Sequence, residues 1–199
     1  MTREKSMTQQ DRARRTRVAL IRAAALEFDR DGYVGASMGR IAQTAGLSMG
    51  ALTFHFSSKS DVADAVVEHA RTVIVSVLDD VGSHGGDAPL DHLGRLVVAL
   101  ARTLHDNVEV RGAARLEYDR PEHAVRWSSD WFPVMRHLAV AACRSGEVSA
   151  EMSADRVAQL AALLVRAAEV QRRTGADGDG FTPQQFAGLW GVAVRGIRG

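Results

Sequence analysis

The sequence of 199 residues predicts an all-α protein with about nine helices. Apolar residues recur at intervals of three and four along most of the chain, which is the period of an amphipathic helix. No segment shows the alternation of apolar and polar residues, bounded by hairpin turns, that is typical of strands. Serine or threonine precedes several of the apolar runs, and glycine or proline follows them. We therefore expect helices joined by short turns.

The chain is expected to begin with a flexible basic arm over residues 1–13. This stretch is polar and includes Arg3, Lys5 and Arg12. Such composition favours disorder, and a basic arm can follow a DNA backbone. The first helix is expected over 14–30, because one helical stripe holds its apolar residues, which are Val18, Ile21, Ala25 and Phe28. Gly32 and its neighbours are expected to break that helix.

Two short helices are expected on either side of a turn at Gly46. Ser37 is positioned to cap the first of them, although its hydroxyl could also reach a phosphate. Ser48 is positioned to cap the second, which extends from Met49 to Phe56. This connection is typical of a helix-turn-helix, whose second helix can lie in a DNA major groove. An ordinary helical hairpin is the alternative.

The residues around that turn resemble the signature of the TetR family of one-component repressors. The matching residues are Ile41-Ala42, Ala45-Gly46-Leu47-Ser48, the run from Gly50 to Phe56, and Ser58-Lys59. The resemblance implies a helix-turn-helix DNA-binding domain over 14–60 and double-stranded operator DNA as the partner. Leu52 and Phe56 are expected to pack inward. The candidate DNA contacts are Ser37, Arg40, Ser48, Met49, Gly50, Thr53, Phe54, His55 and Lys59.

Two residues of the second helix differ from the family pattern. Met49 stands where close relatives often have lysine, and Thr53 stands where the family has tyrosine. A lysine can donate to guanine, whereas a methionine offers only an apolar contact, for instance to a thymine methyl group. We therefore expect an altered operator preference.

The charge of the chain is divided unevenly along its length. The overall net charge is +1, but residues 1–60 carry ten lysines and arginines against five acidic residues, so the remainder is acidic. Because phosphate neutralisation supplies most sequence-independent DNA affinity, a basic N-terminal part fits a DNA-binding role. The alternative is a solvated charged tail.

Six further helices are expected after the DNA-binding segment. They lie at about 58–80, 93–104, 110–118, 131–143, 153–172 and 183–198. Ser58 to Asp61 and Thr182 to Gln185 have capping-box patterns. The resemblance implies that residues 61–199 form a helical ligand-binding and dimerisation bundle.

The last two expected helices resemble the pair that builds the four-helix homodimer interface in the TetR family. The candidate dimerisation residues are Leu160, Leu164, Phe186, Leu189, Trp190 and Val194. A core within one subunit is the alternative interpretation of these apolar residues.

A second set of residues resembles the γ-butyrolactone receptor branch of the family. It comprises Ala113-Ala114-Arg115-Leu116, Trp131 and Gly146-Glu147-Val148. The resemblance implies a small-molecule inducer of lactone or furan type, or a related antibiotic-pathway metabolite, and control of antibiotic biosynthesis. The candidate ligand contacts are Trp131, Leu116, Glu117 and Met135. The alternatives are a regulator of efflux or catabolic genes with an unrelated apolar ligand, and a receptor that no longer responds to the usual signal.

Other functions lack a signal in the sequence. No phosphate-binding glycine loop, nucleophile elbow or zinc-spaced cluster is evident, so we expect no enzymatic activity, no cofactor and no metal. Asp177 and Asp179 lack the carboxylate spacing of a calcium loop and indicate a linker. No apolar run approaches the length of a membrane span, and a cytoplasmic location is expected. A helical protein-interaction module without DNA activity is the remaining alternative.

Overall fold

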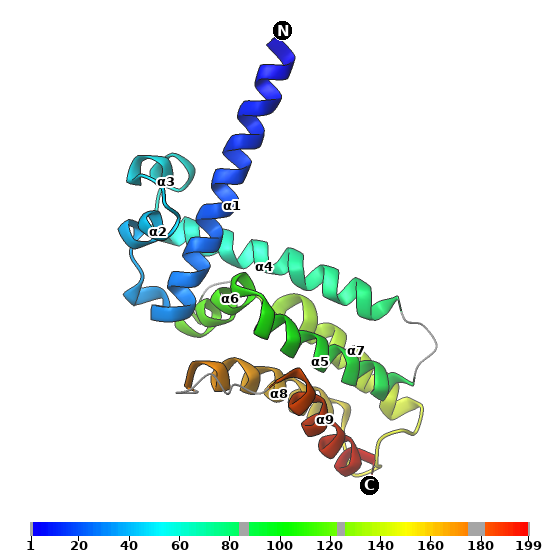
Figure 1. Ribbon diagram of the computed structural model, residues 1–199. Helices are drawn as coiled ribbons and strands as arrows, with labels where there is room; N and C mark the ends of the chain where they lie inside the picture. The colour runs from blue at the N-terminus through cyan, green and yellow to red at the C-terminus, as the bar shows by residue number, and fades with distance from the viewer. Residues whose placement is uncertain (1, 84–87, 123–125, 175–181, 199) are drawn as a thin grey trace. The chain divides into compact units, whose positions relative to one another are not determined.

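The protein is all-α in the computed structural model, which describes residues 2–83, 88–122, 126–174 and 182–198. The predicted linker around Asp177 and Asp179 lies outside these residues. The helices in the described ranges are α1 (Thr2–Gly35), α2 (Met38–Thr44), α3 (Met49–His55), α4 (Lys59–Gly82), α5 (Pro89–Asp106), α6 (Val108–Asp119), α7 (Ser128–Arg144), α8 (Ala154–Thr174) and α9 (Pro183–Arg198) (Figure 1). The predicted all-α class is confirmed.

The helices form two compact units. The first consists of Met1–Ala70 and Val108–Trp127, and the second of Arg71–Asn107 and Ser128–Gly199. Helix α4 crosses from one unit to the other. The first unit includes α6, which was predicted to lie in the 61–199 domain. None of the helices in the described ranges combines the length and hydropathy that crossing a bilayer requires.

In the first unit, α1 packs along α6 and also contacts α2, which contacts α3 in turn (Figure 1). Helix α6 approaches α1 closely at Gly112. A side chain at this position would lie 2.8 Å from the carbonyl oxygen of Ala25. The absence of a side chain at Gly112 therefore permits the two helix backbones to touch. The core between the helices includes Leu20, Phe28, Ile41, Leu52 and Phe56, so the predicted inward packing of Leu52 and Phe56 is confirmed.

Helix α1 begins earlier than predicted. It starts at Thr2, so the structure contradicts the irregular arm expected over 1–13. The physical reason is that the stretch contains no glycine or proline and is rich in glutamine, arginine and lysine, which have high helix propensity even without an apolar stripe. The predicted break is present, because Gly32 has a φ of 70° and interrupts the helical geometry.

In the second unit, α5 packs against α7, α8 and α9 (Figure 1). Its buried stripe supplies the centre of the core with leucine side chains, among them Leu93, Leu96 and Leu100. Helix α9 begins with the predicted capping box. The Gln185 side chain accepts a hydrogen bond from the backbone N–H of Thr182 at 2.8 Å, and the Thr182 hydroxyl accepts one from the Gln185 N–H at 3.3 Å.

Candidate functional site

The turn between α2 and α3 has the geometry that the sequence predicted. The Ser37 hydroxyl accepts a hydrogen bond from the Arg40 N–H at 3.3 Å, and the Ser48 hydroxyl accepts one from the Ala51 N–H at 3.1 Å. Gly46 has a φ of 65°, and the Leu47 N–H closes the end of α2 on the Ala42 carbonyl at 2.9 Å. This left-handed glycine ends α2 and lets α3 begin three residues later. The predicted helix caps are confirmed.

Helix α3 exposes one side and buries the other. Met49 is 47% exposed and Phe54 is 82% exposed, whereas Leu52 is fully buried. Gly50 and Thr53 are also exposed, and His55 is half-buried. The Thr53 hydroxyl donates to backbone carbonyls of its own helix, those of Met49 at 3.1 Å and Gly50 at 3.2 Å. Predicted contacts Met49, Gly50, Thr53 and Phe54 therefore share one exposed surface.

A buried carboxylate joins α1 to α2. Glu27 is only 1% exposed. Its oxygens accept hydrogen bonds from the Thr44 hydroxyl at 2.7 Å and from the Arg30 guanidinium at 2.7 Å. A guanidinium nitrogen of Arg40 lies 3.0 Å from one of the same oxygens. The hydrogen bond to Glu27 is the largest of the causes that raise the pKa of Arg30. Glu27 thus satisfies its buried charge through partners on both helices.

Two cations predicted to contact phosphate are engaged inside the unit. Arg40 pairs with both Glu27 and Asp31. The Lys59 ammonium donates to the carbonyls of Tyr33 at 2.8 Å and Ala36 at 3.0 Å, and lies 4.5 Å from the Tyr33 ring centroid. These carbonyls end α1, where the helix dipole favours a positive charge. The predicted phosphate contacts of both residues stay predictions: the half-buried Lys59 is held at the end of α1, and Arg40, still partly exposed, is oriented by its acidic partners.

The start of α4 has the predicted capping box. Asp61 accepts hydrogen bonds from the N–H groups of Ser57 and Ser58, both at 3.1 Å, and the Ser58 hydroxyl accepts one from the Asp61 N–H at 3.1 Å. The Asp61 carboxylate also accepts from the Ser57 hydroxyl, which is the largest of the causes that lower the pKa of Asp61. Deprotonated Asp61 therefore holds the turn between α3 and α4.

Three charged contacts fasten α6 to the rest of the first unit. Arg111 pairs with Asp29 at 2.7 Å, and Arg120, just after the helix, pairs with Asp64 at 3.0 Å. Asp119 accepts a hydrogen bond from the Tyr33 N–H at 2.8 Å, directly after the break in α1. Helix α6 is therefore held at α1 and at α4, the two helices that flank the helix-turn-helix.

Basic side chains extend from α1 beside α3. The Arg17 guanidinium lies 4.4 Å from the centroid of the Phe56 ring and donates to the His55 carbonyl at 3.4 Å. Arg12, Arg14 and Arg15 follow toward the N-terminus and are exposed.

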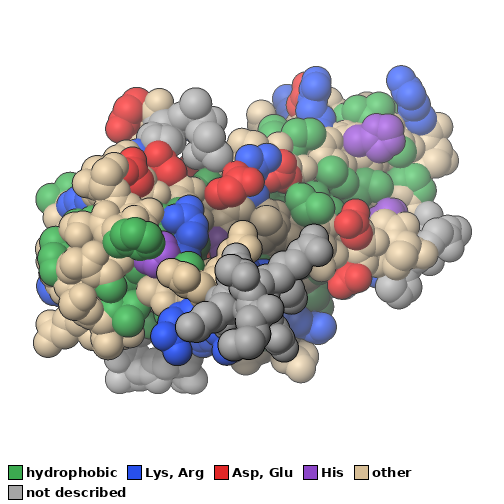
Figure 2. Space-filling view, turned by 90° about the horizontal axis from the view of Figure 1, so that it is seen from above, with side chains coloured by type: hydrophobic (Ala, Val, Ile, Leu, Met, Phe, Trp, Pro, Cys, Tyr) green, Lys and Arg blue, Asp and Glu red, His purple; other side chains and the backbone are tan. Residues whose placement is uncertain are grey.

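The face of the molecule in Figure 2 has no uniform charge, because basic, acidic and apolar side chains are interspersed across it.

Comparison with known proteins places this geometry in a family. Residues 20–66, which include α2, α3 and the first turns of α4, match the model of the bacterial regulatory proteins of the tetR family. The matched segment belongs to the TetR family. It is 37% identical over 68 residues to the A-factor receptor protein of Streptomyces griseus, a match that covers 34% of this chain and 25% of that protein.

Solved structures extend the similarity beyond the matched segment. A γ-butyrolactone receptor described as ArpA-like is 28% identical with a TM-score of 0.74, and the match covers 93% of this chain and 89% of that one. The TetR family protein CprB from Streptomyces coelicolor, solved in complex with its operator, is 28% identical with a TM-score of 0.76, covering 94% and 90%. Over most of its length, the chain is thus similar to proteins described as γ-butyrolactone receptors.

The candidate ligand residues lie in different units. Trp131 and Met135 are buried on α7 in the second unit, one helical turn apart. Leu116 is buried and Glu117 half-buried on α6, in the first unit. Trp131 and Met135 alone are therefore brought together on one helix face.

The candidate dimerisation residues divide between core and surface. Phe186 and Trp190 are 1% and 7% exposed within their own unit, so the structure corrects their predicted role as partner-facing residues. The reason is that the broad apolar face of α9 packs on α5 of the same chain. Leu189 is exposed, and Leu160, Leu164 and Val194 are half-buried.

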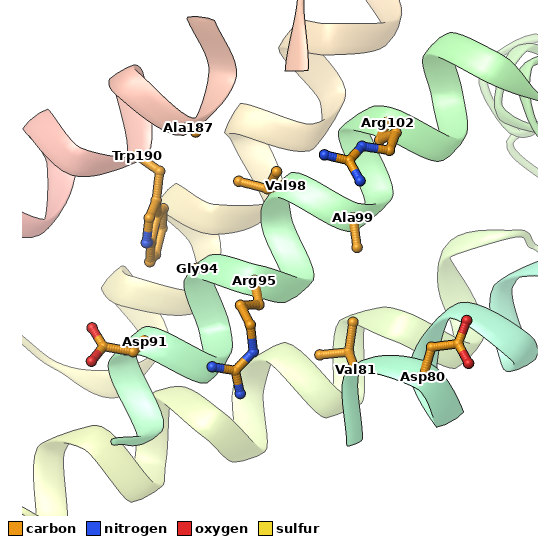
Figure 3. A pocket seen from close by; sticks show the side chains of 10 residues that line it. All are labelled: Asp80, Val81, Asp91, Gly94, Arg95, Val98, Ala99, Arg102, Ala187 and Trp190. Carbon is orange, nitrogen blue, oxygen red and sulfur yellow. The ribbon is translucent and has the colours of Figure 1, made fainter. Parts of the chain in front are cut away.

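A surface groove of about 510 Å³ lies between α5, α9 and the end of α4 (Figure 3). The indole of Trp190 forms one wall beside Gly94, and Val81 and Val98 contribute apolar surface. Arg95 and Arg102 add positive charge, opposed by Asp80 and Asp91. Its volume is within the range of small-molecule sites. No local sequence pattern indicates this groove, because α9 comes to it from a distant part of the chain.

The buried role of Glu27 was not predicted either, because in the sequence it looks like any solvent-exposed glutamate of a helix. In the structure, removal of its charge should lower the stability of the fold. We expect Glu27→Gln to lower the free energy of unfolding by about 1 to 3 kcal/mol, because Thr44 and Arg40 of α2 lose a charged acceptor that is itself buried. Chemical denaturation measures this loss, with Asp11→Asn, which removes an exposed carboxylate from the same helix, as the control. Equal stability of the two variants would contradict the role of Glu27.

Proposed function

We propose that this chain is a TetR-family transcriptional repressor that binds a two-fold symmetric operator as a homodimer and is released by a small apolar inducer. The observation that carries the proposal is the capped turn that leaves one side of α3 exposed beside the arginines of α1. A short exposed helix of this kind fits a DNA major groove. The relative CprB, which shares 28% identity with this chain, is described in complex with its operator sequence.

The arginines of α1 are the groups that we propose to contact phosphates. Arg17 joins α1 to α3 through its contacts with His55 and Phe56. Arg14 lies one turn before Arg17 on the same side of the helix, about 4.5 Å along the axis. Its exposed guanidinium is therefore carried next to the helix that enters the groove. Arg12 and Arg15 extend the positive charge along the same helix.

We expect Arg14→Ala to weaken binding to every DNA duplex and to reduce the slope of log affinity against log salt by about 1, because one phosphate contact is lost. Titration of labelled operator at several salt concentrations measures the slope. Arg156→Ala, which removes an exposed arginine from α8 in the second unit, is the control and should leave the slope unchanged. If both variants give the wild-type slope, Arg14 makes no phosphate contact.

We propose that the exposed apolar residues of α8 and α9 form the homodimer interface. Leu163 is 62% exposed and Val192 is 57% exposed, and Leu189 adds to the same pair of helices. Half-buried Leu160, Leu164 and Val194 border them. Two copies joined here would bury these side chains in a four-helix arrangement. A two-fold axis then requires half-sites separated by one DNA turn, about 34 to 36 Å, or a multiple of it.

The dimer is tested by placing charge in that surface. We expect the double variant Leu163→Glu and Leu189→Glu to sediment as a monomer and to lose most operator affinity, because a buried carboxylate without a partner opposes association. Val34→Glu alters an apolar residue of the first unit that is even more exposed, and it should remain dimeric. A dimeric double variant would refute this interface.

We propose that the inducer is a small lactone, furan or related antibiotic-pathway molecule that binds beside Trp131 and Met135. Similarity to proteins described as γ-butyrolactone receptors supports this chemistry. Both side chains are buried, so a ligand reaches them only in a conformation in which the surrounding helices separate. Binding would then favour that conformation over the one that fits the operator, which is linkage between two sites.

A release screen with lactones, furans and antibiotic-like compounds identifies the inducer, and two tryptophan variants locate its site. We expect Trp131→Phe to raise the inducer concentration for half-release by about tenfold, equivalent to 1.4 kcal/mol, with operator affinity changed less than twofold. Trp190→Phe alters the groove of Figure 3 and should release normally. The opposite result would place the ligand in the groove.

A further inference from the structure

The exposed surface of α3 contains few polar groups that are available to DNA. The Ser48 hydroxyl accepts the capping N–H and keeps its own proton at the very start of the helix, whereas the Thr53 hydroxyl donates its only proton to carbonyls of the helix itself. Gly50 has no side chain. The nearby cations Arg40 and Lys59 are held by acidic groups and by backbone carbonyls. Hydrogen-bond readout of base edges therefore has little support on this helix.

Two large apolar side chains border that surface instead. With 100° of rotation per residue, Met49 and Phe54 lie about 140° apart around the helix, and Thr53 and Gly50 lie between them. Both border residues are exposed, whereas Leu52 on the opposite side is buried. The surface thus has two apolar edges and a shallow centre that lets the helix approach a groove floor closely.

The base-edge group that such side chains can recognise is the methyl group of thymine. Each base pair presents a distinct pattern in the major groove, and the C5-methyl group of thymine is the apolar element of that pattern. Arginine contacts to phosphate supply affinity without sequence information. The apolar edges of α3 are therefore left to supply discrimination.

We infer that this protein reads its operator through thymine methyl groups, with Met49 and Phe54 as the specificity-determining residues. The inference rests on the proposed DNA-binding function and adds the chemical feature that is read. Because methyl contacts involve no charge, they contribute to sequence preference without contributing to the salt dependence of binding.

Replacement of thymine by deoxyuridine tests the inference, because the two bases differ only in the C5-methyl group and keep the same hydrogen-bonding groups. With full-length protein and its operator, we expect deoxyuridine at one or more thymines of each half-site to weaken binding about three- to fivefold, the effect of one lost methyl contact. In Met49→Ala or Phe54→Ala, the sensitivity to deoxyuridine should disappear at the thymine that the removed side chain contacts, with the salt slope unchanged.

Val34→Ala provides the control, because it removes an exposed apolar side chain of the first unit that lies outside α2 and α3. It should bind operator within twofold of the wild type. Thermal denaturation confirms that the variants fold, as expected for exposed positions. A protein that binds its operator selectively but tolerates deoxyuridine at every thymine overturns the inference alone. A protein that binds no duplex selectively overturns the proposed function as well.

Discussion

The buried carboxylate of Glu27 is the interaction on which the DNA-binding geometry depends. A charge removed from water is tolerated only when hydrogen-bonding partners surround it, and two of the partners of Glu27 lie on α2. This constraint fixes α2 against α1, and the left-handed turn at Gly46 then fixes where α3 starts. The 7-residue α3 is too short to be stable alone and takes its position from these neighbours. The exposed side of α3 is therefore a consequence of how α1 and α2 are joined.

Helix α6 belongs to the first unit but is joined at both ends to helices of the second unit. Its ion pairs with Asp29 and Asp64, together with the contact of Asp119 to the Tyr33 N–H, make it part of the DNA-binding unit. The chain nevertheless enters α6 from α5 and leaves it toward α7, both in the second unit. With α4, this makes three covalent connections between the units. A ligand that changes the second unit can act on the DNA-binding unit through them, provided that it binds the two conformations with different affinity.

Local features of the fold could be predicted from the sequence, whereas contacts between residues far apart in the sequence could not. Helix caps at Ser37, Ser48 and Thr182 depend on residues within four positions, so the sequence reveals them. The inward packing of Leu52 follows from helical spacing in the same way. The structural roles of Glu27 and Lys59 depend on partners 17 and 26 residues away, which no local pattern shows.

Helix α9 shows that an apolar pattern alone does not separate core residues from interface residues. Four of its apolar residues were assigned to a partner surface, with a core within one subunit as the alternative, because an apolar stripe does not say whether the covering helix belongs to the same chain. In the structure, α5 covers Phe186 and Trp190, while Leu189 and Val192 stay exposed. A helix with apolar residues on more than one face can serve a core and an interface together.

Selection from a pool of randomised DNA duplexes with the full-length protein tests the central claim most directly. If Glu27 and its partners hold α3 as a DNA-reading helix, the bound fraction should converge on a two-fold symmetric sequence whose half-sites lie one DNA turn, or a multiple of it, apart. A bound fraction with no shared sequence after repeated rounds at physiological salt would contradict the account.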